Sequence, residues 1–154
     1  MSTSPQDGSS SVDHGLMCWL SVEQVRENWG EIKNRLSEDP RFQRYFSIES
    51  FVEDVSKHYV QVWTAGKDLL ILTRIDTYPS GVRSLRVLWA AGSGLNHLLP
   101  TIVDVFRRFA QQNQCDDVEL MGREGWSRKL RKLVSVREIQ STLVIPVGMN
   151  GWSN

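Results

Sequence analysis

The chain has 154 residues and a formal net charge of zero. That length suits one domain, and a composition of 40% hydrophobic and 23% charged residues can bury a core without disulfide or metal staples. A net charge of zero gives no indication that the partner is a nucleic acid or an acidic surface. Up to Asp76 there are eight Lys and Arg residues against twelve Asp and Glu, and beyond it ten against six, so the second half is mildly basic.

The first fourteen residues differ from the rest. Residues 1–14 are polar and rich in serine, so alone they cannot bury enough apolar surface to become ordered. We expect either a flexible arm or an arm that a partner orders, followed by one domain over residues 15–154. The chain begins without the basic and apolar regions of a signal peptide, and no apolar run approaches the roughly 20 residues that span a bilayer. We therefore expect no membrane partner and a cytoplasmic or particle-associated protein, with Cys18 and Cys115 as buried free thiols.

Helices follow a short first strand. We predict that strand over 15–20, one helix from 21 to 39 and a second helix over 50–57. Each helix begins with a capping pair, whose side chains satisfy unpaired backbone N–H groups. The first helix ends before a proline, because the residue preceding a proline avoids the helical conformation. These signals are Ser21 with Gln24, Ser50 with Glu53, and Asp39-Pro40.

The pattern then changes to strands. β-branched and aromatic residues at 59–64 and 69–75 flank a tight turn at Gly66-Lys67, which predicts a hairpin. A turn over 78–81, with proline second and glycine fourth, leads to a third strand over 85–91.

Helix and strand alternate in the second half. Apolar residues at helical spacing predict a long helix from Leu95 to Asn113, with Pro100 in its first turn, where a missing N–H costs little. The remaining elements are a strand, a short helix and a last strand, expected at 117–121, 124–134 and 142–147.

This order predicts a single α/β domain with a mixed, mostly antiparallel sheet and helices on both faces. The order after residue 15 resembles the GNAT acyltransferase superfamily. Within it, the segment from Cys115 to Leu130, with Gly122-Arg123 and Gly125-Trp126, is similar to the "GC..VEL.GR.GW.R.L" segment of small GNAT-like proteins of tailed phages and prophages. Some relatives in that group are internal virion proteins, and most have no assigned function. The resemblance thus implies a GNAT-like fold and a place in a virion or in the host cytoplasm.

The resemblance also implies where a cofactor would bind. GNAT enzymes hold the diphosphate of acetyl-CoA on backbone N–H groups at the start of the long helix, where donors and positive potential gather. Gly92, Ser93 and Gly94 match the glycine part of the family's motif, but Trp89 stands where the family has Gln or Arg. We expect these three residues to line the diphosphate if acyl-CoA binds, and we expect no cofactor otherwise.

The catalytic residues stay unknown from the sequence. The family often uses a Glu or a bound water as base and a Tyr on the last helix as acid. No Tyr follows Tyr78 here, and the strand over 85–91 has no carboxylate. Glu119 is a weak candidate for the base, the alternative being a solvated strand residue. His58 and His97 are read as surface or satisfied polar residues.

A basic helix face is the candidate interaction surface. Its residues could contact protein partners or hold a phosphate, or they could simply be solvated, and the scarcity of aromatic neighbours makes nucleic acid a weak expectation. No metal-ligand spacing accompanies it. The residues are Arg123, Arg128, Lys129, Arg131 and Lys132.

Two functions remain open. One is a non-catalytic, phage-type GNAT-fold protein, a pseudoenzyme that acts in or on a virion through contacts with other proteins. The other is an acetyl-CoA-dependent N-acetyltransferase. Trp89, the missing acid and the missing strand carboxylate favour the first, whereas the two glycines and the element order favour the second. A fold alone does not decide, because function depends on the site.

Overall fold

The computed structural model describes residues 17–120, 126–134 and 136. The chain divides into two compact units, Met1–Leu120 and Met121–Asn154. The predicted arm over 1–14 and the predicted last strand over 142–147 lie outside the described residues. None of the described helices is long and apolar enough to cross a membrane.

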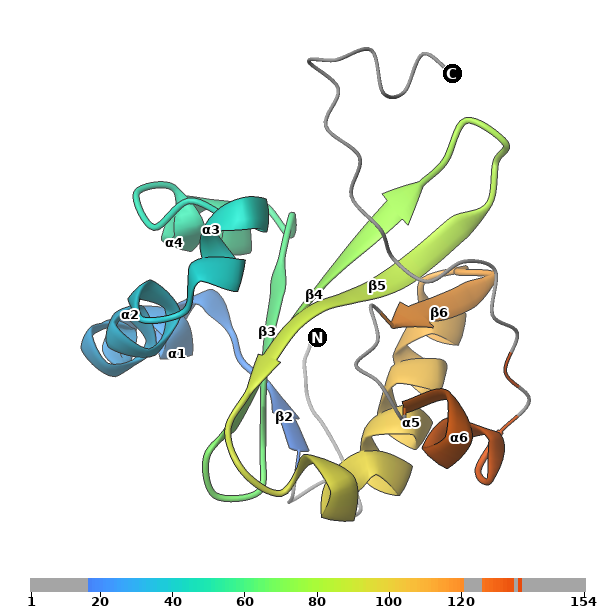
Figure 1. Cartoon of the computed structure of the whole chain (residues 1–154). Coiled ribbons are helices and arrows are strands. Elements are labelled where there is room, and N and C mark those ends of the chain that lie inside the picture. Colours follow the sequence, from blue (N-terminus) through green and yellow to red (C-terminus); the bar gives the residue numbers. More distant parts are fainter. Residues whose placement is uncertain (1–16, 121–125, 135, 137–154) are drawn as a thin grey trace, which may run out of the picture. The chain divides into compact units, whose positions relative to one another are not determined.

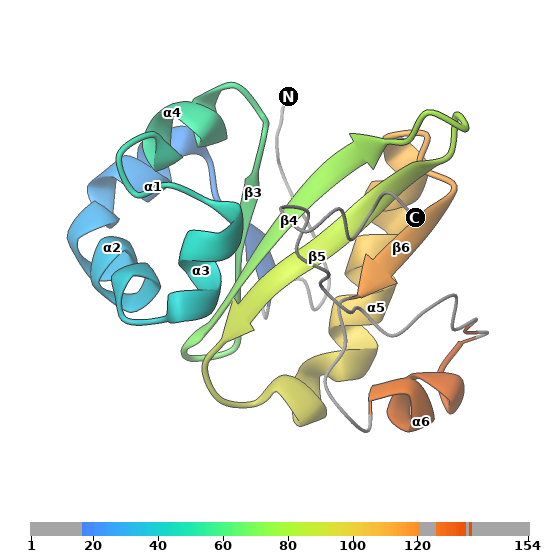
Figure 2. The same cartoon turned by 45° about the horizontal axis from the view of Figure 1, so that its top comes forward.

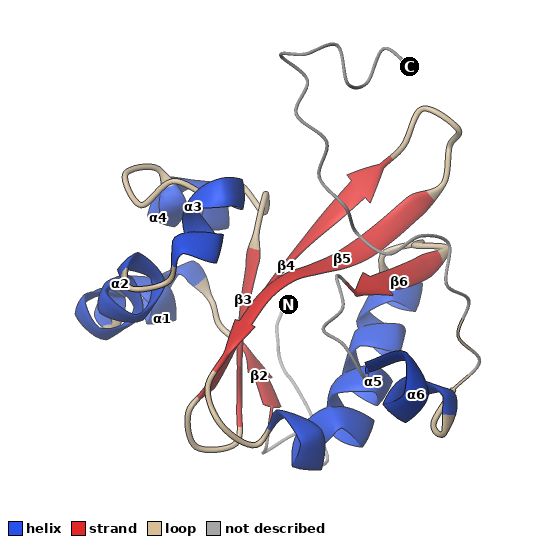
Figure 3. Cartoon of the chain, viewed as in Figure 1, coloured by secondary structure: helices blue, strands red, loops and turns tan. Residues whose placement is uncertain are grey.

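A five-stranded sheet forms the centre of the larger unit, in the order β2-β3-β4-β5-β6 (Figure 1). Neighbouring strands are antiparallel from β2 to β5, and β5 and β6 are parallel. This confirms the predicted mixed, mostly antiparallel sheet (Figure 3). The strands are β2 (Met17–Trp19), β3 (Gln61–Ala65), β4 (Leu69–Thr77), β5 (Arg83–Ala91) and β6 (Asp117–Leu120).

Helices cover both faces of the sheet (Figure 2). Four short helices pack on one face and the long helix α5 packs on the other. Strand β4 shows how the sequence produces this: Leu69 and Ile71 join the core under α5, whereas Leu70 and Leu72 join the core under the short helices, because successive side chains point to opposite faces. The helices are α1 (Val22–Glu27), α2 (Trp29–Ser37), α3 (Pro40–Tyr45), α4 (Phe51–Ser56) and α5 (Leu95–Gln112).

The predicted first helix is two helices in the structure. The capping box of Ser21 and Gln24 forms as expected. However, α1 ends at Glu27 and Asn28 leaves the helical conformation, with its side-chain amide donating to the Gln24 carbonyl at 2.8 Å. The apolar face nevertheless continues through α2, where Ile32 and Leu36 are buried.

One helix was not predicted, and one predicted capping pair was wrong. Asp39-Pro40 follows α2 but also begins α3, with the Asp39 carboxylate accepting from the Arg41 N–H at 2.9 Å. Ser50 lies at the N-cap position of α4, but its side chain makes no hydrogen bond to the helix backbone. Its hydroxyl donates to the Asp54 carboxylate instead.

Helix α5 carries the third correction. It begins at Leu95, directly after Gly94 in the left-handed conformation, so Pro100 lies in its second turn rather than its first. The long apolar stripe forms as predicted, and Leu98, Ile102 and Phe106 are buried in it. In the smaller unit the structure describes one helix, α6 (Trp126–Arg131), within the range predicted for a helix.

Candidate functional site

A glycine-rich turn joins β5 to the first turn of α5. Gly92 and Gly94 have φ values of 125° and 86°, in the region that favours glycine. The first N–H groups of a helix have no acceptor within that helix, and they carry its positive partial charge. The turn therefore places Ser93 and the start of α5 where an anion could be held.

The chain's own Asp68 already interacts with this turn. One carboxylate oxygen, Oδ1, accepts from the Ser93 N–H at 3.0 Å and from the Ser93 hydroxyl at 2.7 Å. The hydroxyl contact is the main reason that the pKa of Asp68 lies below its usual value. A diphosphate at this turn would meet a carboxylate in place of a free N–H group, so the donors present do not suit that anion.

Gly92 is required by packing within the sheet. A Cβ at this position would overlap the carbonyl oxygen of Asp68 and would lie 2.8 Å from the Cα of Leu69. The close approach belongs to the start of β4, so Gly92 is explained without a ligand.

Two guanidinium groups close over the end of β5. Arg35 from α2 donates to the carbonyl oxygens of Asp68 at 2.5 Å and of Ala91 at 3.0 Å. Arg41 from α3 donates to the Ala90 carbonyl at 3.4 Å. The end of β5 therefore has hydrogen-bond partners from the helical layer.

The tryptophan in the family's Gln or Arg position is buried. Trp89 is 3% exposed and belongs to the core under the short helices. Its indole N–H donates to the Asp39 carboxylate at 3.1 Å. Arg41 holds the pKa of that carboxyl at about 2, so Asp39 is charged at neutral pH. Trp89 thus anchors α3 to the sheet.

Strand β5 extends past its parallel partner. Pairing with β6 runs from Ser84 opposite Asp117 to Val87 opposite Leu120, and β5 then continues to Ala91. The register between β4 and β5 shifts at this point, between Leu72 and Thr73. A bulge of this kind bends the strand and increases its local twist.

A charged network crosses three strands. Asp76 on β4 accepts from Arg74 at 3.0 Å and from Arg86 on β5 at 2.9 Å. Arg86 lies 3.4 Å from Glu119 on β6, measured from Nε to Oε1. The other Glu119 oxygen accepts from the Tyr78 hydroxyl at 2.7 Å. Burial is the largest influence on the pKa of Tyr78 and, with the Glu119 contact, raises it to about 12.

Glu119, the sequence candidate for a base, is therefore part of an ion-pair network. Each of its oxygens has a partner, so a proton taken from a substrate would come at the expense of the Tyr78 or Arg86 contact. Its role as a base stays a prediction. The parallel register sets Arg86 opposite Glu119, which explains the pairing.

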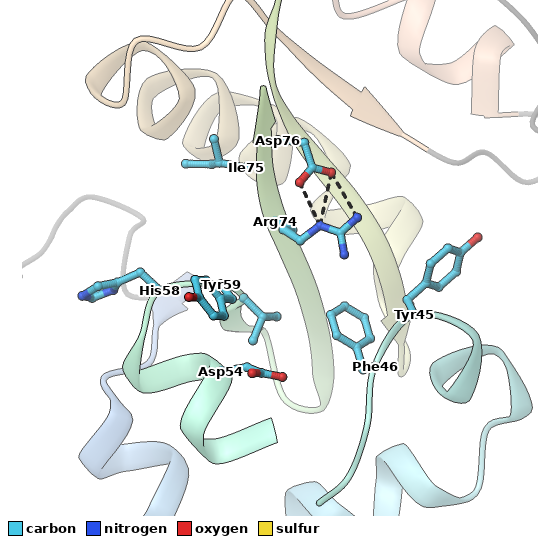
Figure 4. Close-up of a pocket in the computed structure, with 9 residues that line it drawn as sticks. Tyr45, Phe46, Asp54, His58, Tyr59, Arg74, Ile75 and Asp76 are labelled. Carbon is cyan, nitrogen blue, oxygen red and sulfur yellow. Dashed lines mark hydrogen bonds and ion pairs between the residues drawn. The ribbon is translucent and has the colours of Figure 1, made fainter. Parts of the chain in front are cut away.

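A pocket of about 430 Å³ lies beside this network. Figure 4 shows Arg74 and Asp76 on one wall and Asp54 on the opposite wall, with Phe46 and Tyr59 between them. The pocket adjoins the network through Asp76, which contacts Arg86.

The other residues singled out in the sequence do not assemble with these groups. His97 is an exposed residue of α5, and His58 lies at the rim of the pocket. Both cysteines are free thiols, as predicted, but Cys18 is exposed and Cys115 is half-buried, so the prediction that both are buried was wrong. Burial raises the pKa of Cys115, which disfavours a nucleophilic thiolate. Across the described part of the chain, no cluster of three or more His, Cys, Asp or Glu residues could hold a metal ion.

The predicted basic face is described only in part. Arg123 lies outside the described residues. The other four members are exposed in the smaller unit, so their side chains can be reached by solvent: Arg128, Lys129, Arg131 and Lys132.

Comparison with solved structures shows the fold. The chain is similar to a predicted acetyltransferase with acetyl-CoA from Clostridium acetobutylicum (TM-score 0.56, 10% identity, 86% of this chain and 96% of that one). It is also similar to ribosomal-protein-alanine N-acetyltransferase from Brucella melitensis (0.53, 15%, 84% and 98%) and to glucosamine-6-phosphate N-acetyltransferase from Arabidopsis thaliana (0.53, 11%, 84% and 97%). The chain has the GNAT fold. No protein-family model matches the sequence, and a search of curated proteins finds no match.

The glycine turn has the position that the resemblance predicts for a cofactor site, but its contacts differ from that expectation. The turn stands at the start of the long helix, where the resemblance predicts the diphosphate of acyl-CoA. Yet Asp68 accepts from Ser93, and Trp89 is committed to Asp39. Cofactor binding by Gly92, Ser93 and Gly94 stays a prediction.

Sequence reasoning missed three residues of this region. Asp68 and Arg35 are 25 and 58 residues away from Ser93, and no spacing rule connects them to it. Tyr78 was recognised only as a turn residue, although an aromatic hydroxyl at the end of a hairpin is within reach of the neighbouring strand. The alternation of β6, which puts Glu119 on the same face as Arg86, could have suggested that contact.

Proposed function

We propose that the chain is a non-catalytic GNAT-fold protein that acts by docking onto other proteins, as a component of a phage particle. The similarity of the segment from Cys115 to Leu130 to small phage proteins supports the particle as its location. One observation carries the loss of acyl transfer: the Asp68 carboxylate is held on the N–H and the hydroxyl of Ser93.

The physical argument is electrostatic. A helix N-terminus attracts an anion because N–H groups and the helix dipole point at it. Asp68 supplies that negative charge from within the chain, and its lowered pKa keeps it ionised at neutral pH. An incoming diphosphate must displace this carboxylate or bear its repulsion, so acyl-CoA binds weakly or not at all.

The closed end of β5 supports the same conclusion. Arg35 and Arg41 donate to the carbonyl groups of Ala91 and Ala90. Both arginines come from the helical layer, and both also contact acceptors of their own chain, Asp68 and Asp39. Opening this end would break several hydrogen bonds at once.

The alternative is an acetyl-CoA-dependent N-acetyltransferase. It is favoured by the GNAT fold and by the Tyr78–Glu119 contact of 2.7 Å, since a tyrosine and a carboxylate can pass a proton between them. In that case Gly92, Ser93 and Gly94 would hold the diphosphate after Asp68 moves away. One residue of the pair would return a proton to the leaving thiolate.

Deletion of residues 1–14 tests the docking role. These residues are polar and rich in serine and offer little to a core, so the isolated domain should keep its free energy of unfolding within about 0.5 kcal/mol. Incorporation of the truncated protein into the parent particle should fall. Equal incorporation of the full and truncated chains would show that the arm is not a docking element. Absence of the full chain from purified particles would contradict the particle role itself.

A charge reversal tests the second contact surface. Arg128→Glu combined with Arg131→Glu should weaken association and reduce its salt dependence. Arg26→Glu combined with Arg107→Glu, at exposed positions of α1 and α5, is the matched control for the change in net charge. If both variants bind equally at low salt, the basic face is only a solvated surface.

A further inference from the structure

The pocket beside the charged network lies away from the glycine turn. It lies between the end of α3, the connection from α4 to β3, and the second half of β4 (Figure 4). Leu69, at the start of β4, lies against Gly92, and Arg74 is five residues further along. At about 3.3 Å per residue, the pocket is roughly 17 Å from the glycine turn.

One negative charge in this pocket is not balanced. Asp76 forms ion pairs with both Arg74 and Arg86. Asp54, on the opposite wall, accepts a hydrogen bond from the Ser50 hydroxyl at 3.1 Å and has no ion-pair partner in the described part of the chain. Of the two carboxylates that line the pocket, Asp76 is balanced by Arg74 and Arg86, whereas Asp54 has no ion pair among the described residues.

Aromatic rings stand beside the unbalanced carboxylate. Phe46 forms part of the wall, and Tyr59 is 60% exposed, so its ring is accessible to a ligand. The backbone holds Tyr59 there: its N–H donates to the Asp54 carbonyl at 2.9 Å, and the preceding His58 has a φ of 64°. The left-handed His58 and this hydrogen bond end helix α4, so the helix terminus fixes the backbone position of Tyr59 beside Asp54.

We propose that this pocket binds the lysine side chain of a partner protein. The ammonium would lie between Asp54 and the ring of Tyr59, where ionic attraction and the cation–π interaction act together. Its methylene groups would pack on Val60 and Ile75, which also line the pocket. The proposal rests on the proposed docking function and names the chemistry of the group that docks.

Nuclear magnetic resonance of the labelled full chain tests this binding. The probe is Nα-acetyl-lysine methylamide, and its matched neutral control carries a second acetyl group on Nε. The lysine probe should shift backbone amide signals around Asp54, Tyr59 and Arg74 with a Kd of roughly 1 mM, a value expected for one side chain. Equal shifts with the neutral control, or no shifts at all, would overturn the proposal.

Two substitutions locate the site. Asp54→Asn keeps an acceptor for Ser50 but removes the charge, and it should weaken lysine binding at least about fivefold. Asp104→Asn, at an exposed position on α5, is the control and should leave the affinity unchanged. An Asp54→Asn protein that is folded, as judged by its other amide signals, and binds as well as the wild type would contradict the site.

Two further experiments distinguish the source of the ligand and test the proposed function separately from the site. Spermidine that binds while the lysine probe does not would show that a free polyamine, and not a partner's lysine, is the ligand. A lysine peptide incubated with acetyl-CoA and analysed by mass spectrometry tests the proposed function separately. If the peptide is acetylated and also binds at the pocket, the non-catalytic role is refuted and the site is kept. If the peptide is not acetylated and does not bind, only the site is refuted.

Discussion

Tyr78 shows how a single contact sets the chemistry of a side chain. Burial and the Glu119 carboxylate raise the pKa of its phenol to about 12. A raised pKa means that the neutral phenol is favoured in the folded state. Its contribution to stability is therefore complete below the usual value of about 10 and is lost as the pH rises through 12.

Spectroscopic titration of the phenolate band checks this value. The wild type should show one ionisation near pH 12 that is missing in Tyr78→Phe. Glu119→Gln should lower the midpoint of that step, because it removes the negative acceptor. Tyr45→Phe is the control and should keep the step. A Tyr78 ionisation at the ordinary value, unchanged by Glu119→Gln, would show that the contact does not form in solution.

Two glycines should respond in opposite directions to alanine. Gly92→Ala places a Cβ against the backbone of Asp68 and Leu69 at a φ of 125°, so we expect a loss of at least about 2 kcal/mol. Gly30 lies inside α2 with open space around it, so Gly30→Ala should stabilise the protein by about 0.5–1 kcal/mol. Urea unfolding measures both values. A neutral Gly92→Ala would mean that β4 does not approach the turn this closely.

At the scale of elements, α5 organises one of the two cores. Phe106 is 1% exposed and packs edge-on against Trp63 at 5.0 Å between ring centroids. Phe106→Ala should cost about 3–5 kcal/mol, because it removes a buried ring and leaves a cavity. Arg107→Ala, on the exposed side of the helix, should change stability by less than about 0.5 kcal/mol. A loss below about 1 kcal/mol for Phe106→Ala would show that α5 is not central.

The predicted elements succeeded where a local pattern decided them. The hairpin of β3 and β4 follows from β-branched and aromatic residues on both sides of Gly66, and α5 follows from its apolar stripe. The break at Asn28 was missed, because the apolar spacing continues across it. Helix α3 was missed because Asp39-Pro40 was read as a stop signal, although Asp followed by Pro is equally a helix start.

The candidate site was harder to predict than the fold. The sequence identifies Gly92, Ser93 and Gly94 as the turn, and Trp89 as the departure from the family pattern. The carboxylate that meets this turn could not be predicted, because Asp68 reaches Ser93 only after β4 and β5 have paired. The Tyr78–Glu119 contact depends in the same way on the parallel register of β5 and β6.

At the scale of the whole molecule, the chain has a GNAT fold, but the Asp68 carboxylate accepts from Ser93 at the glycine turn before α5. Such a chain should gain no stability from acetyl-CoA. A ligand present at one hundred times its Kd adds about 2.7 kcal/mol to the free energy of unfolding, which raises the Tm of a domain of this size by roughly 5–10 °C.

Thermal unfolding of the full chain with and without ~1 mM acetyl-CoA is therefore the decisive measurement. Asp68→Asn serves as the matched variant, since it removes the charge at the turn and keeps a hydrogen-bond acceptor for Ser93. If the Asp68 carboxylate repels the cofactor, acetyl-CoA should shift the Tm of the wild type by less than about 1 °C and that of Asp68→Asn by more. A wild-type shift of several degrees, equal to that of Asp68→Asn, would mean that the turn binds the cofactor and that the chain retains the acetyl-CoA site of an N-acetyltransferase.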